Sequence, residues 1–139
     1  MNKIIFWTLL FLCPAAAFAA EPASPKAMIE TFFGEVQKGN IVAAYDQLFL
    51  GSTIPVDKPQ AVTVLKQQTQ TGLPLYGKIL GFELVHEEKL SESVIRYVYI
   101  LKTEKAPLTW EFYFYKPKSE WFLANISFND QFNFLGAKK

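Results

Sequence analysis

Clustered charge is scarce in this sequence of 139 residues. Lys and Arg together number 14 and Asp and Glu number 13, which gives a formal net charge of +1. No run of basic residues is longer than the terminal pair, Lys138 and Lys139. Nucleic acids and anionic membrane surfaces both bind proteins through clustered basic side chains, so we expect neither as a partner.

Thiols and imidazoles are almost absent as well, because the sequence holds one cysteine, Cys13, and one histidine, His86. A zinc site requires three or four convergent ligands. Oxygen-only cation sites cluster acidic residues in a loop, whereas Asp46, Asp57 and Asp130 are scattered along the chain. No glycine-rich loop opens a helix to hold phosphate groups. We therefore expect neither a metal nor a cofactor.

A run long enough to span a membrane is also missing. The apolar stretch Ile4–Leu12 has only about half of the roughly 20 residues that a membrane-spanning helix requires. It follows Lys3 and precedes a small-residue tract that ends at Ala19 and Ala20. This pattern predicts a signal peptide over residues 1–19, cleaved after Ala19. We expect an exported protein, periplasmic or secreted, with no membrane attachment after cleavage.

Cleavage would also remove the only thiol, because Cys13 lies in the leader. Leu12 precedes this cysteine where a lipid-anchored leader needs a small residue, so we do not expect lipidation. The mature chain then cannot form a disulfide. A chain of roughly 120 residues buries about two thirds of its unfolded surface, which is enough for one ordinary core.

The mature chain divides into a helical half and a strand half. Residues 20–25 are rich in Ala, Pro and Ser and form a predicted tether, and residues 26–139 form a predicted single domain. Ser24 and Pro25 are an N-cap and a first helical residue. Apolar spacings of three and four then predict three helices, which run from 25 to 38, from 41 to 49, and from about 57–59 to 71.

From Gly77 onward, the apolar residues alternate with a period of two, which predicts four antiparallel strands. If Leu101 pairs with Leu108, one face of the sheet is continuously aromatic and aliphatic. The opposite face carries a mixed set of polar and apolar side chains around Arg96 and Glu111. The predicted fold class is α+β, with three N-terminal helices packed on a curved antiparallel sheet of about four strands.

This order of elements resembles the nuclear-transport-factor-2-like (cystatin-like) superfamily over about residues 25–132. Local patterns that carry the resemblance are Ala44–Asp46 on the second helix, the helix break at Lys38–Asn40, the turn Leu75–Lys78 before the sheet, and the closing segment Glu120–Leu123. The resemblance implies a cone-shaped fold with a pocket between helices and sheet, and frequent dimerisation through the outer sheet face. That superfamily includes isomerases, dehydratases, hydrolases and ligand binders, so it does not select an activity.

Few side chains offer acid or base chemistry. The candidates are Asp46 beside Tyr45, His86 at the end of the first predicted strand, and Glu83 within that strand. Each also has a simpler interpretation as a solvated surface residue. No serine-nucleophile elbow is present, and any triad would have to use His86.

The aromatic residues gather in three adjacent predicted strands. Three interpretations remain open: a plain core, a self-association surface, and a pocket for an apolar or ring-shaped ligand. The candidate pocket residues are Tyr45, Tyr97, Tyr99, Trp110 and Phe112. The candidate dimer or partner face comprises Arg96, Val98, Ile100, Glu111, Tyr113 and Tyr115.

Two classes of function follow. The first is an exported non-enzymatic domain that binds a small apolar ligand or a protein partner, with a homodimer formed through the outer sheet face. The second is a small pocket enzyme of the isomerase or hydratase type that uses a carboxylate or His as acid and base.

Overall fold

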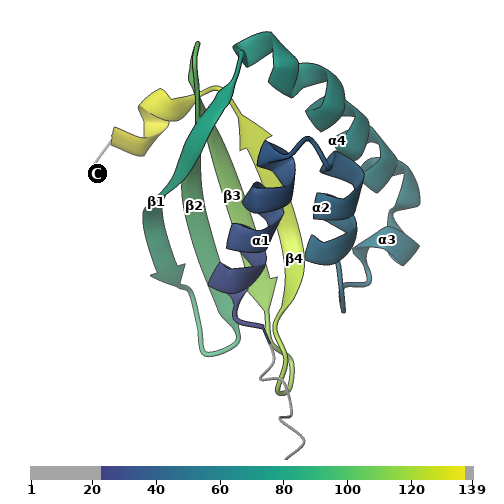
Figure 1. Cartoon of the computed structure of the whole chain (residues 1–139). Helices are drawn as coiled ribbons and strands as arrows, with labels where there is room; N and C mark the ends of the chain where they lie inside the picture. The colour runs from purple at the N-terminus through teal and green to yellow at the C-terminus, as the bar shows by residue number, and fades with distance from the viewer. Residues whose placement is uncertain (1–22, 137–139) are drawn as a thin grey trace, which may run out of the picture.

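The computed structural model describes residues 23–136, so the predicted leader at 1–19 lies outside the described residues. The described chain is α+β, and its sheet is antiparallel with strand order β1-β2-β3-β4 (Figure 1). The elements are α1 (Pro25–Gln37), α2 (Ile41–Leu48), α3 (Ile54–Asp57), α4 (Pro59–Gly72), the 3-10 helix η1 (Leu73–Tyr76), β1 (Ile79–Lys89), β2 (Val94–Thr103), β3 (Pro107–Tyr115), β4 (Phe122–Asn129) and the 3-10 helix η2 (Phe132–Gly136).

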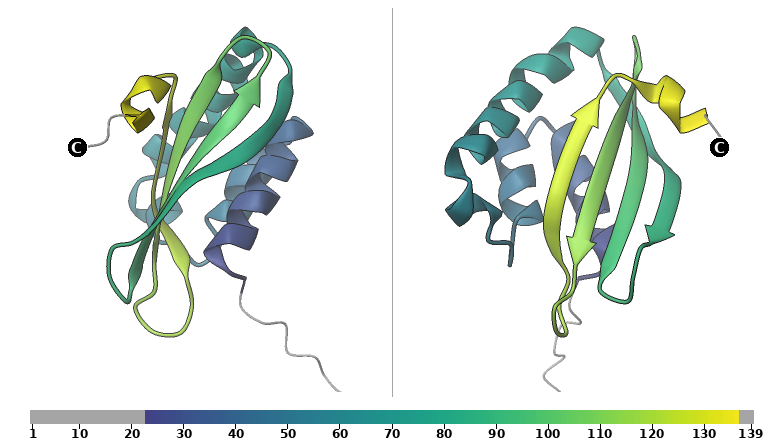
Figure 2. Two further views of the ribbon diagram at one scale, coloured as in Figure 1. Left: turned by 90° about the vertical axis from the view of Figure 1, so that its left-hand side faces the viewer. Right: turned by 180° about the vertical axis from the view of Figure 1, so that it is seen from behind.

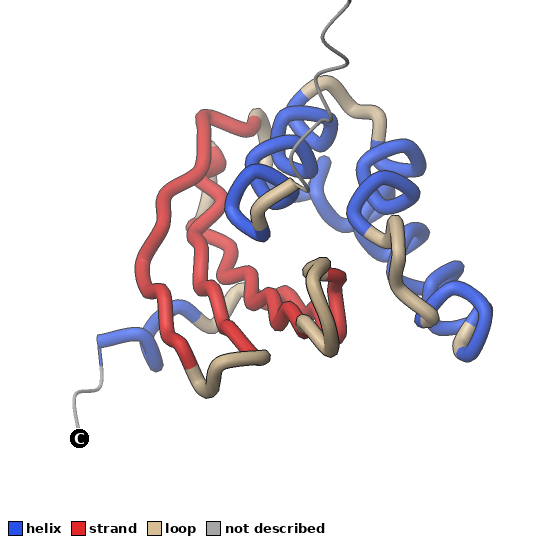
Figure 3. Tube along the Cα trace, turned by 90° about the horizontal axis from the view of Figure 1, so that it is seen from below, coloured by secondary structure: helices blue, strands red, loops and turns tan. Residues whose placement is uncertain are grey.

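The helices and the sheet form two layers. The helices α1 to α4 lie on one side of the sheet, which we call the inner face, and η2 lies on the opposite, outer face (Figure 2). Seen from below, the sheet curves and α1 lies on its concave side (Figure 3). This arrangement leaves one sheet face for the core and the other partly open.

The boundaries of α1 follow from local sequence, as predicted. The Ser24 hydroxyl accepts a hydrogen bond from the Ala27 N–H at 3.2 Å, and Pro25 starts the helix. At the other end Gly39 has a φ of +82°, a conformation that residues with a Cβ adopt rarely. The helix buries Ile29, Phe32, Phe33 and Val36, which recur at spacings of three and four.

The prediction of three helices was wrong, because four α-helices precede the sheet within residues 23–136. Asp57, where we expected the third helix to begin, ends the short α3 instead. Lys58 has φ −136° and ψ 54°, outside the helical region. Since a residue that precedes proline is disfavoured in the helical region, Pro59 separates α3 from α4.

The predicted pairing of β2 with β3 is confirmed, with Leu101 opposite Leu108 and Tyr99 opposite Trp110. Arg96 lies on the outer face near Glu111, also as predicted. The alternating pattern and the pairing of Leu101 with Leu108 were sufficient to set this register.

Two bulges alter the predicted faces of the edge strands. A register shift between Leu84 and His86 places His86 opposite Val98 on the outer face, and Glu87 opposite Tyr97 on the inner face. The alternation of the sequence alone predicts His86 on the same face as Leu84, and this prediction is wrong. A bulge adds one residue to a strand and therefore inverts the alternation beyond it.

The second bulge lies in β4, opposite the step from Tyr113 to Phe114. Phe122 therefore faces outward opposite Tyr115, and Leu123 is fully buried opposite Phe114. The sequence pattern had placed Phe122 on the face of Ile126 instead. In each strand the difference comes from one extra residue. A hydrophobic alternation with a period of two does not predict where that residue lies.

Candidate functional site

Aromatic side chains fill the centre of the space between helices and sheet. The five predicted pocket residues, Tyr45, Tyr97, Tyr99, Trp110 and Phe112, are at most 5% exposed and belong to one core cluster. The Trp110 ring stacks on Phe128 with centroids 4.5 Å apart. The Tyr45 and Thr69 hydroxyls form a buried hydrogen bond of 2.8 Å. The five predicted pocket residues line none of the cavities described below and form part of the core.

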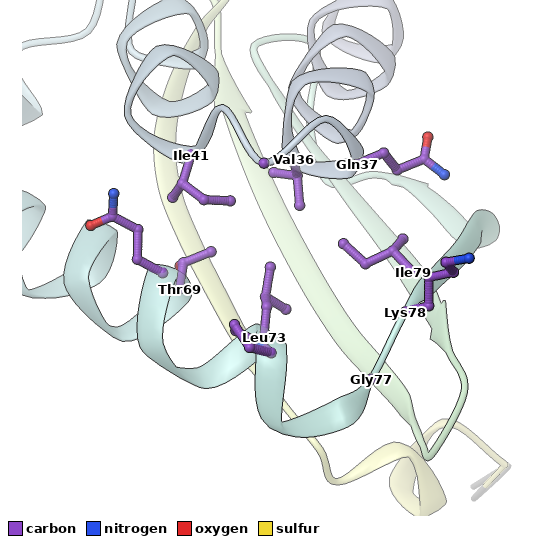
Figure 4. Close-up of a pocket in the computed structure, with 11 residues that line it drawn as sticks. Val36, Gln37, Ile41, Thr69, Leu73, Gly77, Lys78 and Ile79 are labelled. Carbon is purple, nitrogen blue, oxygen red and sulfur yellow. The ribbon is translucent and has the colours of Figure 1, made fainter.

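A cleft opens where the C-terminal ends of α1 and α4 approach the start of the sheet. We call it the mouth cleft, and it has a volume of about 500 Å³. Its floor consists of Val36 from α1, Ile41 from α2, Leu73 from η1 and Ile79 from β1. Figure 4 shows these four aliphatic side chains pointing toward one another across the cleft. Four separate elements thus contribute to one apolar surface.

The rim of the mouth cleft is polar and carries no acidic residue among its lining residues. It includes Gln37, Gln70 and Lys78, all of them exposed. Gln37 and Lys78 point away from the floor in Figure 4. The Lys78 backbone N–H donates a hydrogen bond of 2.9 Å to the Glu104 carboxylate, which holds the turn at Gly77 that forms one wall. An apolar floor with a polar rim suits a ligand that is mainly apolar.

The sequence did not identify the mouth cleft. Its floor residues lie at the ends of helices and strands, beside the turns at Gly39 and Gly77. In the sequence, each of them is indistinguishable from an ordinary core residue. The available signal was the pair of left-handed glycines, because such turns bring the ends of elements together. Which ends meet depends on tertiary packing, so the sequence alone could not assemble the site.

The three acid or base candidates lie apart on exposed surfaces. The Asp46 side chain is 62% exposed on α2 and forms an ion pair with Lys66 of α4. Glu83 is 58% exposed and pairs with Lys102 at 2.9 Å on the outer sheet face. His86 is 57% exposed on the same face. None of the three lines the mouth cleft, and Asp46 lies on α2 whereas Glu83 and His86 lie on β1.

The outer face carries a charged network. The Arg96 guanidinium lies 2.9 Å from Glu111 and 3.2 Å from Glu88, and the Tyr113 hydroxyl donates to Glu111 at 3.3 Å. These contacts place one cation between two carboxylates on partly exposed side chains. Because solvent screens these charges, the network adds little to the free energy of unfolding. Its main effect is to hold the side chains of the outer face in place.

The remaining residues of the predicted partner face differ in exposure. Val98 is only 1% exposed within the monomer, so it offers little surface to a partner. Ile100 is half-buried, and Tyr115 is 39% exposed beside Phe122, with ring centroids 5.6 Å apart. The helix η2 packs against β3 and covers one end of this face (Figure 2). On this side of the sheet, exposed large apolar side chains include Tyr115 at one end and Phe132 of η2.

Three buried tyrosines give the fold a dependence on alkaline pH. Burial, reinforced by the Glu87 carboxylate, raises the pKa of Tyr97 from 10.0 to about 12. Burial, reinforced by Glu30 and Glu87, raises the pKa of Tyr99 from 10.0 to about 12. Burial also raises the pKa of Tyr45, against the opposing effect of its bond to Thr69. The folded state thus favours the neutral phenols.

We predict that the protein loses stability between pH 10 and pH 12, where unfolded tyrosines ionise and folded ones do not. The stabilising effect is complete below pH 10 and is lost as the pH rises through the folded pKa values. Urea midpoints measured across this interval test it. The double variant Tyr97→Phe and Tyr99→Phe should flatten the curve, and an unchanged slope in that variant would contradict the assignment.

Within residues 23–136, no group of three or more His, Cys, Asp and Glu side chains could hold a metal ion. In that same range, no helix has the length and apolar character needed to cross a membrane. Comparison of the chain with protein-family models, with curated proteins and with solved structures found no match.

Proposed function

We propose that this chain is an exported, non-enzymatic binding domain that holds a small apolar molecule in the mouth cleft. The convergence of Val36, Ile41, Leu73 and Ile79 on one space carries the proposal. The volume of about 500 Å³ lies within the range of roughly 300–1,000 Å³ that small-molecule sites occupy. Export rests on the leader predicted at residues 1–19, which places binding in the periplasm or outside the cell.

We also propose membership of the nuclear-transport-factor-2-like superfamily, with its cone-shaped fold. The order of helices followed by a four-stranded antiparallel meander supports this proposal. The position of α1 on the concave side of the sheet supports it further. In this chain, aromatic side chains fill the interior and leave the mouth cleft as the accessible part.

The alternative, a pocket enzyme of the isomerase or hydratase type, has less support. Such an enzyme needs an acid or base inside an enclosed cavity with a shifted pKa. Asp46, Glu83 and His86 are each more than half exposed and lie outside the mouth cleft. We therefore propose binding rather than catalysis.

The substitution Ile79→Glu tests the mouth cleft directly. Ile79 is half-buried, so the fold should tolerate the change, while the carboxylate places a charge on the apolar floor. We expect the affinity for N-phenyl-1-naphthylamine, an uncharged apolar fluorescent probe, to fall by about 10-fold or more, which corresponds to ~1.4 kcal/mol. Fluorescence titration of the purified protein measures this.

Leu80→Glu is the matched control, because Leu80 is the next residue, is 60% exposed and does not line the cleft. This variant should bind the probe as the unaltered protein does. Equal losses in both variants, or no binding by the unaltered protein, would reject the mouth cleft as the site.

Self-association is a second candidate function, favoured by the exposed Tyr115 and the half-buried Phe122, which lie side by side on the outer face. We propose a homodimer through this face, in which Arg96, Ile100 and Tyr113 lie at the contact. Tyr115→Glu should weaken the dimer by about 10-fold or more, as judged by sedimentation equilibrium. Leu84→Glu is the control, because Leu84 is also 39% exposed but lies on the inner face. A monomer at high protein concentration would exclude this dimer.

A further inference from the structure

A groove separates α4 from β4, the strand at one edge of the sheet. It consists of two adjoining hollows of about 470 and 400 Å³, which share Leu65, Gln68 and Ile126. We call it the edge groove. One wall is β4 from residue 124 to 128, and the other is α4 from residue 61 to 72. It is separate from the mouth cleft, with which it has no lining residue in common.

One row of side chains along the helix α4 lines the edge groove, and the small residues in this row leave the groove open. Val62 and Thr69 of α4 are buried against the core, and Val62 also lines one hollow of the groove. The row, at spacings of three and four, comprises Ala61, Leu65, Gln68 and Gly72, all of which line the groove. The row has a small residue at each end, and a Cβ added at Gly72 would meet no atom within 4 Å. The space beside this helix is therefore unfilled.

The two edges of the sheet differ in the features that protect an edge strand. Natural edges are blunted by charged side chains, prolines and bulges. β1 has two register shifts and five ionisable residues, namely Glu83, His86, Glu87, Glu88 and Lys89. β4 has the sequence FLANISFN, with neither charge nor proline, and its one register shift lies at its beginning. From residue 125 to 129, β4 is a regular and uncharged edge.

The backbone of β4 already bonds to a group on the groove side at one point. The Ser52 hydroxyl donates a hydrogen bond of 2.8 Å to the Leu123 carbonyl oxygen. Ser52 precedes α3, so a loop side chain ends the free edge at Leu123. The chain beyond this point presents its outward peptide groups to the groove, where a second strand would satisfy them.

We infer that the edge groove binds an extended peptide segment of a partner protein, which adds to the sheet as a fifth strand beside β4. Five strand residues span about 17 Å at ~3.4 Å per residue, and α4 from residue 61 to 72 spans about the same length at ~1.5 Å per residue. Main-chain hydrogen bonds would supply affinity in this mode of recognition. The apolar groove side chains would take alternate side chains of the peptide.

The chemistry of the groove favours such a segment over other occupants. Its lining includes one charged residue, Lys58, at the end near α3, so it has no cluster that would select a charged small molecule. The amide of Gln68 lies on the helix wall, within an otherwise apolar stripe. A second copy of the domain would bring its own α4 to the same edge, whereas a single extended segment needs only the width of one strand, about 4.8 Å.

The test begins with a phage-displayed library of random peptides about 10 residues long, selected on the purified protein. The tightest peptide is then synthesised in two N-methylated forms, one with the odd and one with the even backbone nitrogens methylated. A strand presents alternate N–H groups to its two sides. We expect one form to lose at least about 10-fold in affinity and the other to retain it. Protection of amides from residue 124 to 128 against hydrogen exchange should accompany binding.

Gly72→Phe should fill the groove and reduce binding of that peptide by about 10-fold or more. Gly34→Phe is the matched control, because Gly34 is also a helical glycine with no atom within 4 Å of an added Cβ. It lies on α1 and should leave binding unchanged. Ile79→Glu should also leave it unchanged, which separates this site from the mouth cleft.

Several results would overturn the inference. They are the absence of any enriched peptide, equal losses in the two methylated forms, or amide protection outside β4. A complex that sedimentation shows to contain two protein copies and no peptide would assign the edge to a second copy instead.

Discussion

Trp110→Ala should lower the free energy of unfolding by about 3–5 kcal/mol, the loss expected for a large aromatic side chain removed from a core. Trp110 is 0% exposed and lies against four other aromatic rings. Its removal leaves a cavity among Phe32, Phe33, Phe112 and Phe128 that rigid neighbours cannot fill. Urea denaturation followed by circular dichroism gives the change.

Trp121→Ala is the matched control for this prediction. The chemical change is the same, but Trp121 is only half-buried and its ring contacts the Lys116 ammonium at 4.9 Å. We expect a loss of about 1 kcal/mol, typical of a contact at the surface. Equal losses in the two variants would mean that Trp110 lines an unfilled pocket and not a packed core.

Trp110→Phe refines the same prediction. The Trp110 indole N–H is buried and has no hydrogen-bond partner among the described residues. Phenylalanine removes this unsatisfied donor, which offsets part of the lost packing. The Phe variant should therefore retain most of the stability that the Ala variant loses.

Gly77→Ala should lower the free energy of unfolding by about 2–3 kcal/mol, because residues other than glycine rarely adopt the backbone conformation at this position. Gly77 has φ +82° and ψ −156°, a region that glycine alone populates. An added Cβ would also lie 2.7 Å from Glu104 Oε2, the atom that accepts the hydrogen bond from the Lys78 N–H. Thermal unfolding of the variant measures the combined effect.

A second background separates the two causes at Gly77. In a Glu104→Ala protein the 2.7 Å clash with Oε2 is removed and only the 3.2 Å contact with the Cβ of residue 104 stays, so the backbone strain should retain most of the cost. Gly34→Ala is the control in a helix, and there alanine should stabilise the protein by about 0.5–1 kcal/mol. If Gly77→Ala is neutral in both backgrounds, the positive φ is not a requirement of the fold.

The sequence correctly predicted the parts of the fold that depend on residues close together in the chain. Ser24 and Gly39 set the limits of α1, and the alternation in β2 and β3 set their register. The errors come from single residues that interrupt a period. The short α3 ends just before Pro59 and was not predicted, and the bulge after Leu84 moves His86 to the outer face.

The site was less predictable than the fold. The sequence left the clustered aromatic residues open as a core, a self-association surface or a pocket, and the five pocket candidates belong to the core, because their size fills the interior. The mouth cleft joins residue 36 to residue 79, and the edge groove joins residue 61 to residue 128. Contacts between positions so distant in sequence depend on how the helices pack on the sheet. The hydrophobic periodicity of the sequence does not predict this packing.

The unequal edges of the sheet have a consequence for polymerisation. A contact between the β4 edge of one copy and the β1 edge of the next would be heterologous and would not close, so copies could add without limit into a fibre. The ionisable residues and two register shifts of β1 make it a poor acceptor for such growth. The β4 edge of one copy therefore meets no suitable edge on the next copy, and the domain can keep one uncharged edge without forming filaments.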